Sequence, residues 1–187
     1  AKRISLTGGI TLTAESLEIR LEDMQWDNDS QAARSEKPVV LRQGNSELRA
    51  DTFVFYPRGD DTEAGQEVLV LFNVQGQIDL SPSPTSPEEN APAASEKSTP
   101  EPVNMNFNRM TLSKAPELRL LNRRLHAITG GVVVDLQSEN EPPAKMEATQ
   151  VTFVYQEKGG MLPESVELSG GVRLSGSLGT IRAQTAK

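Results

Sequence analysis

The segment around residues 119–126 is where positive charge gathers in this sequence. Arg119, Arg123 and Arg124 lie there with His126, in a chain whose formal net charge is -7. A guanidinium group can donate two parallel hydrogen bonds to a phosphate or carboxylate. The three arginines are therefore candidates for binding an anionic head group. The alternative is the solvated face of a hairpin that turns near Asn122, since exposed charge needs no functional explanation.

Residue types that commonly carry catalysis or bind metals are scarce. The chain has one histidine and no cysteine, and it contains no G-x-S-x-G or H-E-x-x-H motif. Asp27-Asn28-Asp29 resembles the start of a calcium loop, but Ala32 and Pro38 stand where an EF-hand needs Gly and Glu, so we interpret it as a turn. We expect no enzymatic activity, no cofactor and no metal site. Glycoside hydrolysis by a pair of carboxylates stays an open alternative, because 26 acidic residues always offer some pair.

Two short repeats predict the elements that carry these residues. The first reads aliphatic, polar, Gly, Gly or Gln, β-branched, any, aliphatic, and it occurs at residues 6–12, 74–80, 128–134 and 168–174. Its glycines lack the spacing of phosphate-binding loops, so we predict turns or bulges that let strands bend. The second repeat places apolar residues three and five positions after Ala14, Ala50 and Ala148. Such repetition indicates stacked copies of one strand pair.

Alternating hydrophobicity predicts β-strands along almost the whole chain. Leu17, Ile19 and Leu21 fall on one face of their segment and charged residues fall on the other. No window of a dozen residues has a sustained helical stripe, so we expect less than about 10% helix. The predicted strands cover residues 4–12, 15–22, 38–43, 47–56, 67–74, 76–80, 103–112, 117–121, 123–129, 131–137, 145–156, 164–169, 171–176 and 179–185.

The same alternation predicts which residues face inward. An inward apolar residue can line a groove or form an ordinary packed core, and the core is the commoner role. The candidates for the inner face are Leu17, Ile19, Phe53, Phe55, Phe72, Val132, Val134, Phe153 and Tyr155.

Residues 81–102 have a different composition. They contain half of the twelve prolines and no aromatic or large aliphatic side chain, so they cannot bury enough apolar surface to offset the entropy of ordering. The repeats continue on both sides of this segment. We therefore predict one domain over residues 1–187 with a disordered insertion at 81–102, with an interdomain linker as the alternative.

Composition also limits the partners. The acidic net charge argues against nucleic acid, whose phosphates need a concentrated basic surface. No apolar run approaches the ~20 residues that cross a bilayer, and no signal-peptide pattern opens the chain. The sequence looks mature-like or trimmed, which is compatible with a leader peptide or membrane anchor upstream of Ala1.

The two repeats together resemble the OstA-like family of lipopolysaccharide-transport proteins, which includes LptA-like and LptC-like members. The likeness is carried by LTGGITLTAESLEIR, GNSELRADTFVFYP, KMEATQVTFVYQ and LSGGVRLSGSLGTIRAQTA, and by Gln25-Trp26-Asp27 followed by Lys37-Pro38-Val39-Val40-Leu41. It covers most of the chain outside residues 81–102, an insertion that departs from the compact family pattern.

This resemblance implies an open antiparallel β-jellyroll that holds lipopolysaccharide acyl chains in a groove between its sheets. It further implies a periplasmic location, with or without an inner-membrane anchor. The expected partners are lipopolysaccharide or a related glycolipid, and homologous jellyroll proteins or further copies of this chain joined by edge strands. Any membrane association would come through those partners or an upstream anchor. The alternative is a structural or scaffolding β-repeat protein that binds other proteins through its sheet edges.

Overall fold

The computed structural model describes residues 3–14, 16–57, 65–80, 108–138, 142–155, 163–177 and 179–186. This part of the chain forms twelve strands in one sheet and contains no helix. The all-β, antiparallel architecture predicted from alternation is therefore confirmed. The strands are β1 (Arg3–Ala14), β2 (Leu17–Asp27), β3 (Ala32–Ser35), β4 (Val39–Gln43), β5 (Ser46–Ala50), β6 (Thr52–Tyr56), β7 (Val68–Asp79), β8 (Arg109–Leu121), β9 (Arg124–Gln137), β10 (Ala144–Val154), β11 (Ser165–Gly176) and β12 (Gly179–Ala186).

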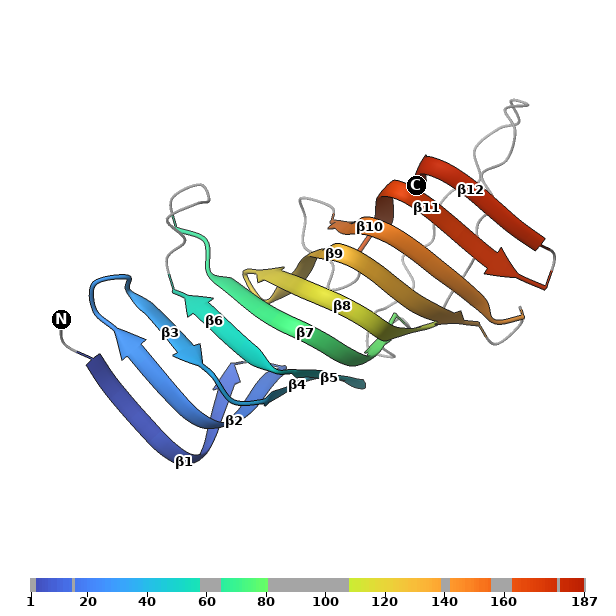
Figure 1. Cartoon of the computed structure of the whole chain (residues 1–187). Helices are drawn as coiled ribbons and strands as arrows, with labels where there is room; N and C mark the ends of the chain where they lie inside the picture. The colour runs from blue at the N-terminus through green and yellow to red at the C-terminus, as the bar shows by residue number, and fades with distance from the viewer. Residues whose placement is uncertain are drawn as a thin grey trace, which may run out of the picture.

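The strands are stacked largely in sequence order. From β7 to β12 each strand pairs with the next, while at the other end β1 pairs with β2. Figure 1 shows β1 and β12 at opposite ends of the stack. Every strand pairing in the described sheet is antiparallel, and two-residue turns such as that between β8 and β9 join antiparallel strands directly.

The glycine repeats mark positions at which the long strands change register. The pairing of β1 with β2 shifts between Thr7 and Ile10, and that of β11 with β12 between Ser169 and Val172. The β7–β8 and β9–β10 ladders shift beside their own repeats. Gly8, Gly76, Gly130, Gly131, Gly170 and Gly171 have positive φ. The predicted bulges are confirmed, and a bulge bends its strand.

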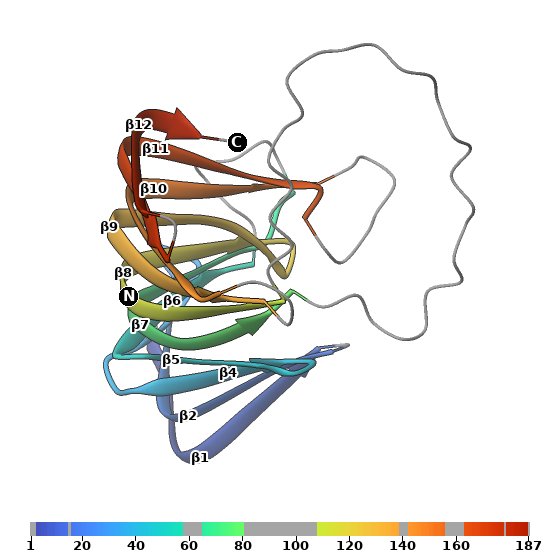
Figure 2. The ribbon, with the colours of Figure 1, turned by 90° about the vertical axis from the view of Figure 1, so that its right-hand side faces the viewer.

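Strands β2 and β7 show how these bends divide the sheet into two walls. β2 pairs with β4 through residues 17–21 and with β3 through residues 25–27. β7 pairs with β6 through residues 68–72 and with β5 through residues 75–77. We call the part containing β3 and β6 the first wall, and the part containing β4 and β5 the second wall. In Figure 2 the strands curve round on one side, and their ends, which we call the rims, lie on the other.

The two walls enclose a single apolar core. Leu71 and Leu118 of the first wall belong to the same buried cluster as Leu48 and Leu112 of the second wall, and each is at most 2% exposed. Leucine, valine and isoleucine make up most of this cluster. Burial of this apolar surface from both walls is the main force that keeps the bent sheet closed.

Residues 81–107 connect two neighbouring strands of the sheet. β7 and β8, which flank this segment, pair from Val68 to Asp79, and the Leu80 N–H donates to the Asn108 carbonyl at 2.8 Å. The segment therefore leaves and re-enters the sheet at one place on a rim. The predicted disorder of residues 81–102 lies outside the described residues.

Gly76 provides a test of the bend. A Cβ at this position would lie 2.9 Å from the Leu48 Cα and closer still to the Glu47 carbonyl oxygen, and φ is +137°. We expect Gly76→Ala to lower the free energy of unfolding by about 3 kcal/mol, since both the backbone of β5 and the backbone angle oppose a side chain. Urea denaturation of the purified protein measures this.

Gly9 is the matched control because it belongs to the same repeat but lacks a positive φ, and a Cβ at its position would meet only open space. Gly9→Ala should change the free energy of unfolding by less than about 1 kcal/mol. Equal effects of the two substitutions would contradict the role assigned to Gly76.

Candidate functional site

Most residues predicted to face inward lie in or against the core between the walls. Phe55 and Tyr155 are half-buried and pack against it. Phe55 and Phe153, which occupy matching repeat positions, therefore differ in depth. The buried candidates are Leu17, Ile19, Phe53, Val132, Val134 and Phe153.

The prediction that Phe72 faces inward is wrong. Leu71 pairs with Phe53 and Leu118, and all three are core residues. Phe72 is the next residue along β7, so its side chain points to the opposite face of the sheet. There it is half-buried and paired with Thr52 and Glu117. A run of apolar residues in β7 hides the alternation at this point.

The middle of the inter-wall space is filled by the protein's own side chains. Leu118, Ile128 and Val134 are all 0% exposed. Sequence reasoning left open whether this space is a groove or a packed core, and in its middle layers it is packed. Any ligand that enters here must therefore displace side-chain contacts or begin at an end of the stack.

The ends of the core are uncovered. Ile4 and Leu6 of β1 are 59% and 45% exposed, and Ile181 of β12 is 62% exposed. Leu6 pairs with Met24, and Ile181 pairs with Leu174. Because Met24 and Leu174 pack against the core, Leu6 and Ile181 lie on the inner face of the sheet. The apolar layer thus reaches both terminal strands, and no element of the described part of the chain covers it there.

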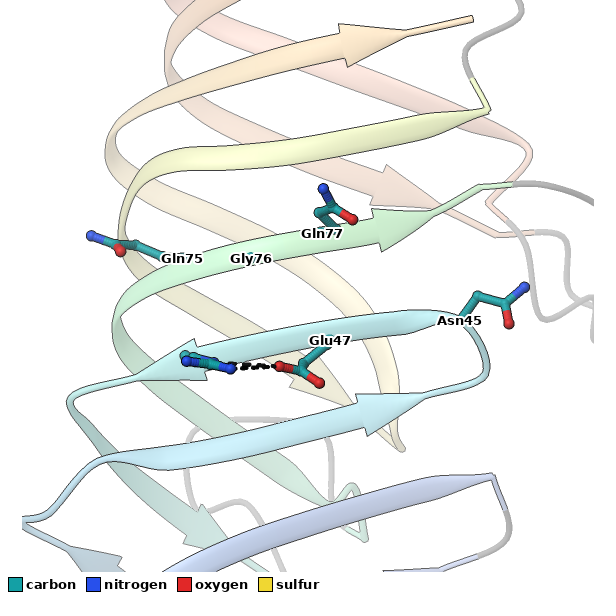
Figure 3. Close-up of a pocket in the computed structure, with 6 residues that line it drawn as sticks. Asn45, Glu47, Gln75, Gly76 and Gln77 are labelled. Carbon is teal, nitrogen blue, oxygen red and sulfur yellow. Dashed lines mark hydrogen bonds and ion pairs between the residues drawn. The ribbon is translucent and has the colours of Figure 1, made fainter. Parts of the chain in front are cut away.

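The outer face carries a polar hollow of about 460 Å³ on β5 and β7. Figure 3 shows Glu47 on β5 and, on the neighbouring strand β7, Gln75 and Gln77, and Arg49 also lines the hollow. The Glu47 carboxylate lies 2.7 Å from Arg42 and 3.1 Å from Arg49. Hydrogen bonds from these two guanidinium groups lower the pKa of Glu47. A carboxylate neutralised in this way is a weaker proton acceptor than a free glutamate.

The structure separates the predicted basic cluster. Arg119 points to the outer face and binds Glu117 at 2.6 Å, and His126 is exposed. Arg123 instead lies in the two-residue turn between β8 and β9, and Arg124 follows it, at a rim of the first wall. Asn122 and Arg123 both have positive φ, 47° and 66°, so the predicted hairpin turn near Asn122 is confirmed.

A hollow of about 120 Å³ lies at this rim, between the β8–β9 turn and the edge of the second wall. The Gln43 amide donates to the Arg123 carbonyl at 3.4 Å and joins the two walls there. The Arg124 guanidinium stacks over the Tyr155 ring, 5.5 Å from its centroid. The sequence analysis did not identify Gln43 or this stacking contact, because both join residues that are far apart in the sequence and meet only in the folded sheet. The lining residues are Ala14, Ser16, Leu17, Gln43, Asn122, Arg123 and Arg124.

The Asp27-Asn28-Asp29 segment forms a turn, as predicted. The Asp27 carboxylate accepts a hydrogen bond from the Asp29 N–H at 2.9 Å, a local contact typical of aspartate in turns. Over the described ranges, no group of three or more histidine, cysteine, aspartate or glutamate side chains could hold a metal ion. Those ranges also contain no helix of the length and apolarity needed to cross a membrane.

Comparison of this chain with protein-family models, with curated proteins and with solved structures finds no match. Its function must therefore be argued from the walls, the uncovered ends and the rim.

Tyr155 provides a pH test of the rim. Burial raises the pKa of its phenol from 10.0 to about 12, and the nearby Arg124 acts in the opposite direction. Between about pH 10 and 12 the folded protein therefore holds a proton that the unfolded chain releases. We expect stability from this group to be intact below pH 10 and to fall as pH rises above it.

Thermal unfolding across this pH range should show a smaller decline for Tyr155→Phe than for the wild type. The ultraviolet difference between the two proteins reports tyrosinate formation at position 155. A phenol that titrates near pH 10 in the folded protein would contradict the burial of Tyr155.

Proposed function

We propose that this protein is a non-enzymatic lipopolysaccharide-binding component of a transenvelope transport bridge. In this proposal the bent sheet is an OstA-like β-jellyroll, and acyl chains lie between its walls. The proposed location is the periplasm, either as a free shuttle of the LptA type or as an anchored subunit of the LptC type.

The observation that carries the proposal is the uncapped apolar layer between the walls. Ile4, Leu6 and Ile181 continue this layer to both terminal strands, where each side chain is exposed. Single exposed apolar residues are common on proteins, but these three lie on the inner face and extend one core. An acyl chain or a second apolar surface placed over them would remove that area from water.

The chemical character of the interior also suits acyl chains. Aromatic residues are only 4% of the sequence, and the core is built mainly of flexible aliphatic side chains. A methylene group gains similar contacts from leucine and from hydrocarbon. Exchange of side-chain contacts for acyl contacts therefore costs little where the walls can separate.

The proposal is tested by looking for bound glycolipid. We expect purified protein to retain or take up lipopolysaccharide or its lipid A part, detected by native mass spectrometry and by photocrosslinking from position 6. Protein that binds neither under conditions where it is folded would refute the proposed function.

Leu6→Asp sharpens this test. A carboxylate at this site would face the hydrocarbon without a partner, which costs several kcal/mol, so we expect lipid A binding to weaken at least tenfold. Because Leu6 is 45% exposed, the unfolding midpoint should change little. Ser5→Asp is the control, since Ser5 is the exposed neighbour whose side chain points to the outer face. Lipid binding retained by Leu6→Asp would exclude this end as an entrance.

The second candidate function is a scaffold that binds proteins through its sheet edges. Its support is that β1 and β12 are terminal strands of the described sheet and contain no proline. Unpaired backbone groups on such edges pair readily with another chain. Edge pairing is also compatible with a bridge of jellyroll subunits, so lipid binding decides between the two functions.

Association through the edges should depend on the exposed end of the core. We expect sedimentation velocity to show larger species as protein concentration rises, and Ile181→Lys to keep the protein monomeric because the lysine cannot be buried at the contact. Thr180→Lys is the matched control, as Thr180 is exposed and lies on the outer face of the same strand. A wild type that stays monomeric at high concentration would contradict edge association.

A further inference from the structure

The rim hollow beside the β8–β9 turn has the character of an anion site. Its side chains include Arg123 and Arg124, and none of its lining residues is acidic. This is unusual in a chain with a net charge of -7. Both arginines are adjacent in the sequence, and the fold brings them, with the turn, to the edge of the second wall.

Arg124 is the cation with the clearest capacity for a ligand. Its guanidinium stacks on Tyr155, and within the described residues it has no carboxylate at ion-pair distance. Stacking uses the face of the guanidinium and leaves its N–H groups at the edge able to donate. Arg123, in contrast, is 3.5 Å from Glu67, so it contributes charge that is partly compensated.

The turn that carries these arginines is held from two directions. Gln43 donates to the Arg123 carbonyl, and the Asn122 side chain accepts from the Glu67 N–H at 3.0 Å. Because the turn is fixed, the arginines that it carries lose less conformational entropy when they bind an anion. The hollow is therefore built by contacts of the turn with both walls.

The hollow also adjoins the apolar interior. Leu17 lines it and belongs to the core between the walls. A ligand at this position would have its charged group among arginine side chains and its apolar part directed at hydrocarbon-like packing. This arrangement fits an amphiphile better than a free anion.

We propose that this rim hollow binds the phosphate or carboxylate of an acylated ligand whose chains enter between the walls. The inference rests on the proposed function and adds to it the site of the head group. It assigns the anion to Arg124 and Arg123 and leaves out Arg119, whose guanidinium is paired with Glu117 on the outer face.

The experiment compares binding of bisphosphorylated lipid A and of its dephosphorylated form to the full chain. We expect Arg124→Gln to weaken binding of the phosphorylated form about tenfold, as for loss of a charge-assisted hydrogen bond, and to leave binding of the dephosphorylated form unchanged. Arg119→Gln is the matched control, with the same change of charge on the outer face, and should bind both forms like the wild type. Unfolding midpoints of all variants show whether each is folded.

Arg124→Lys separates geometry from charge. A lysine keeps the charge but lacks the planar fork and stacks less well on tyrosine, so we expect it to restore only part of the affinity. This intermediate result would support direct contact between the guanidinium and the anion. Full restoration would overturn the assignment of a bidentate contact.

The remaining outcomes separate the two proposals. Equal weakening of both lipid forms by Arg124→Gln would overturn the anion site and leave the lipid-binding function in place. Wild-type protein that binds neither form would overturn the function itself. Inorganic phosphate is a further probe: binding of phosphate that Arg124→Gln abolishes, with lipid A binding unaffected, would overturn the link between this site and an acylated ligand.

Discussion

The bend in the long strands is the constraint on which the rest of the structure depends. A twelve-stranded sheet that stayed open would leave its apolar face in water. The glycine bulges instead turn the strands so that one face closes on itself as two walls with a shared core. At Gly76 the approach of the β5 backbone leaves no room for a side chain. The glycine repeats in the sequence thus mark a bend that recurs in successive strands of the stack.

A stack built in this way has ends as well as a middle. In the middle, each layer is covered by the layers on either side, and residues such as Ile128 are 0% exposed. At β1 and β12, no described strand forms a further layer. Leu6 and Ile181 therefore have the inward register of core residues but are exposed. The exposed apolar surface is therefore a consequence of the stacking, and something that continues the stack is the natural way to cover it.

Alternation in the sequence predicts the antiparallel sheet, most of its strands and most of the inner face, but it misses β3 and joins β5 and β6 into one strand over residues 47–56. It did not predict how strands pass the glycines: residues 67–74 and 76–80 were expected as two strands and form the single strand β7. Phe72 was misassigned because neighbouring residues on both faces of β7 are apolar. The arginine cluster is adjacent in sequence, yet Arg119 lies within β8, where it is paired with Glu117, and Arg124 begins β9, where it stacks on Tyr155. Cross-sheet contacts such as Gln43 with Arg123 depend on packing of the walls, which local patterns do not encode.

The distribution of charge and apolar area also limits where binding energy can arise in the proposed function. Inside the walls, an acyl chain would replace contacts that side chains already make, so little free energy is gained there per unit of area. At the ends, by contrast, covering Leu6 or Ile181 removes apolar surface from water. At the rim, stacking on Tyr155 positions the Arg124 guanidinium beside the apolar interior. Affinity would therefore be concentrated at the ends and at the rim, while an acyl chain in the packed middle would have to displace side chains for little gain in free energy.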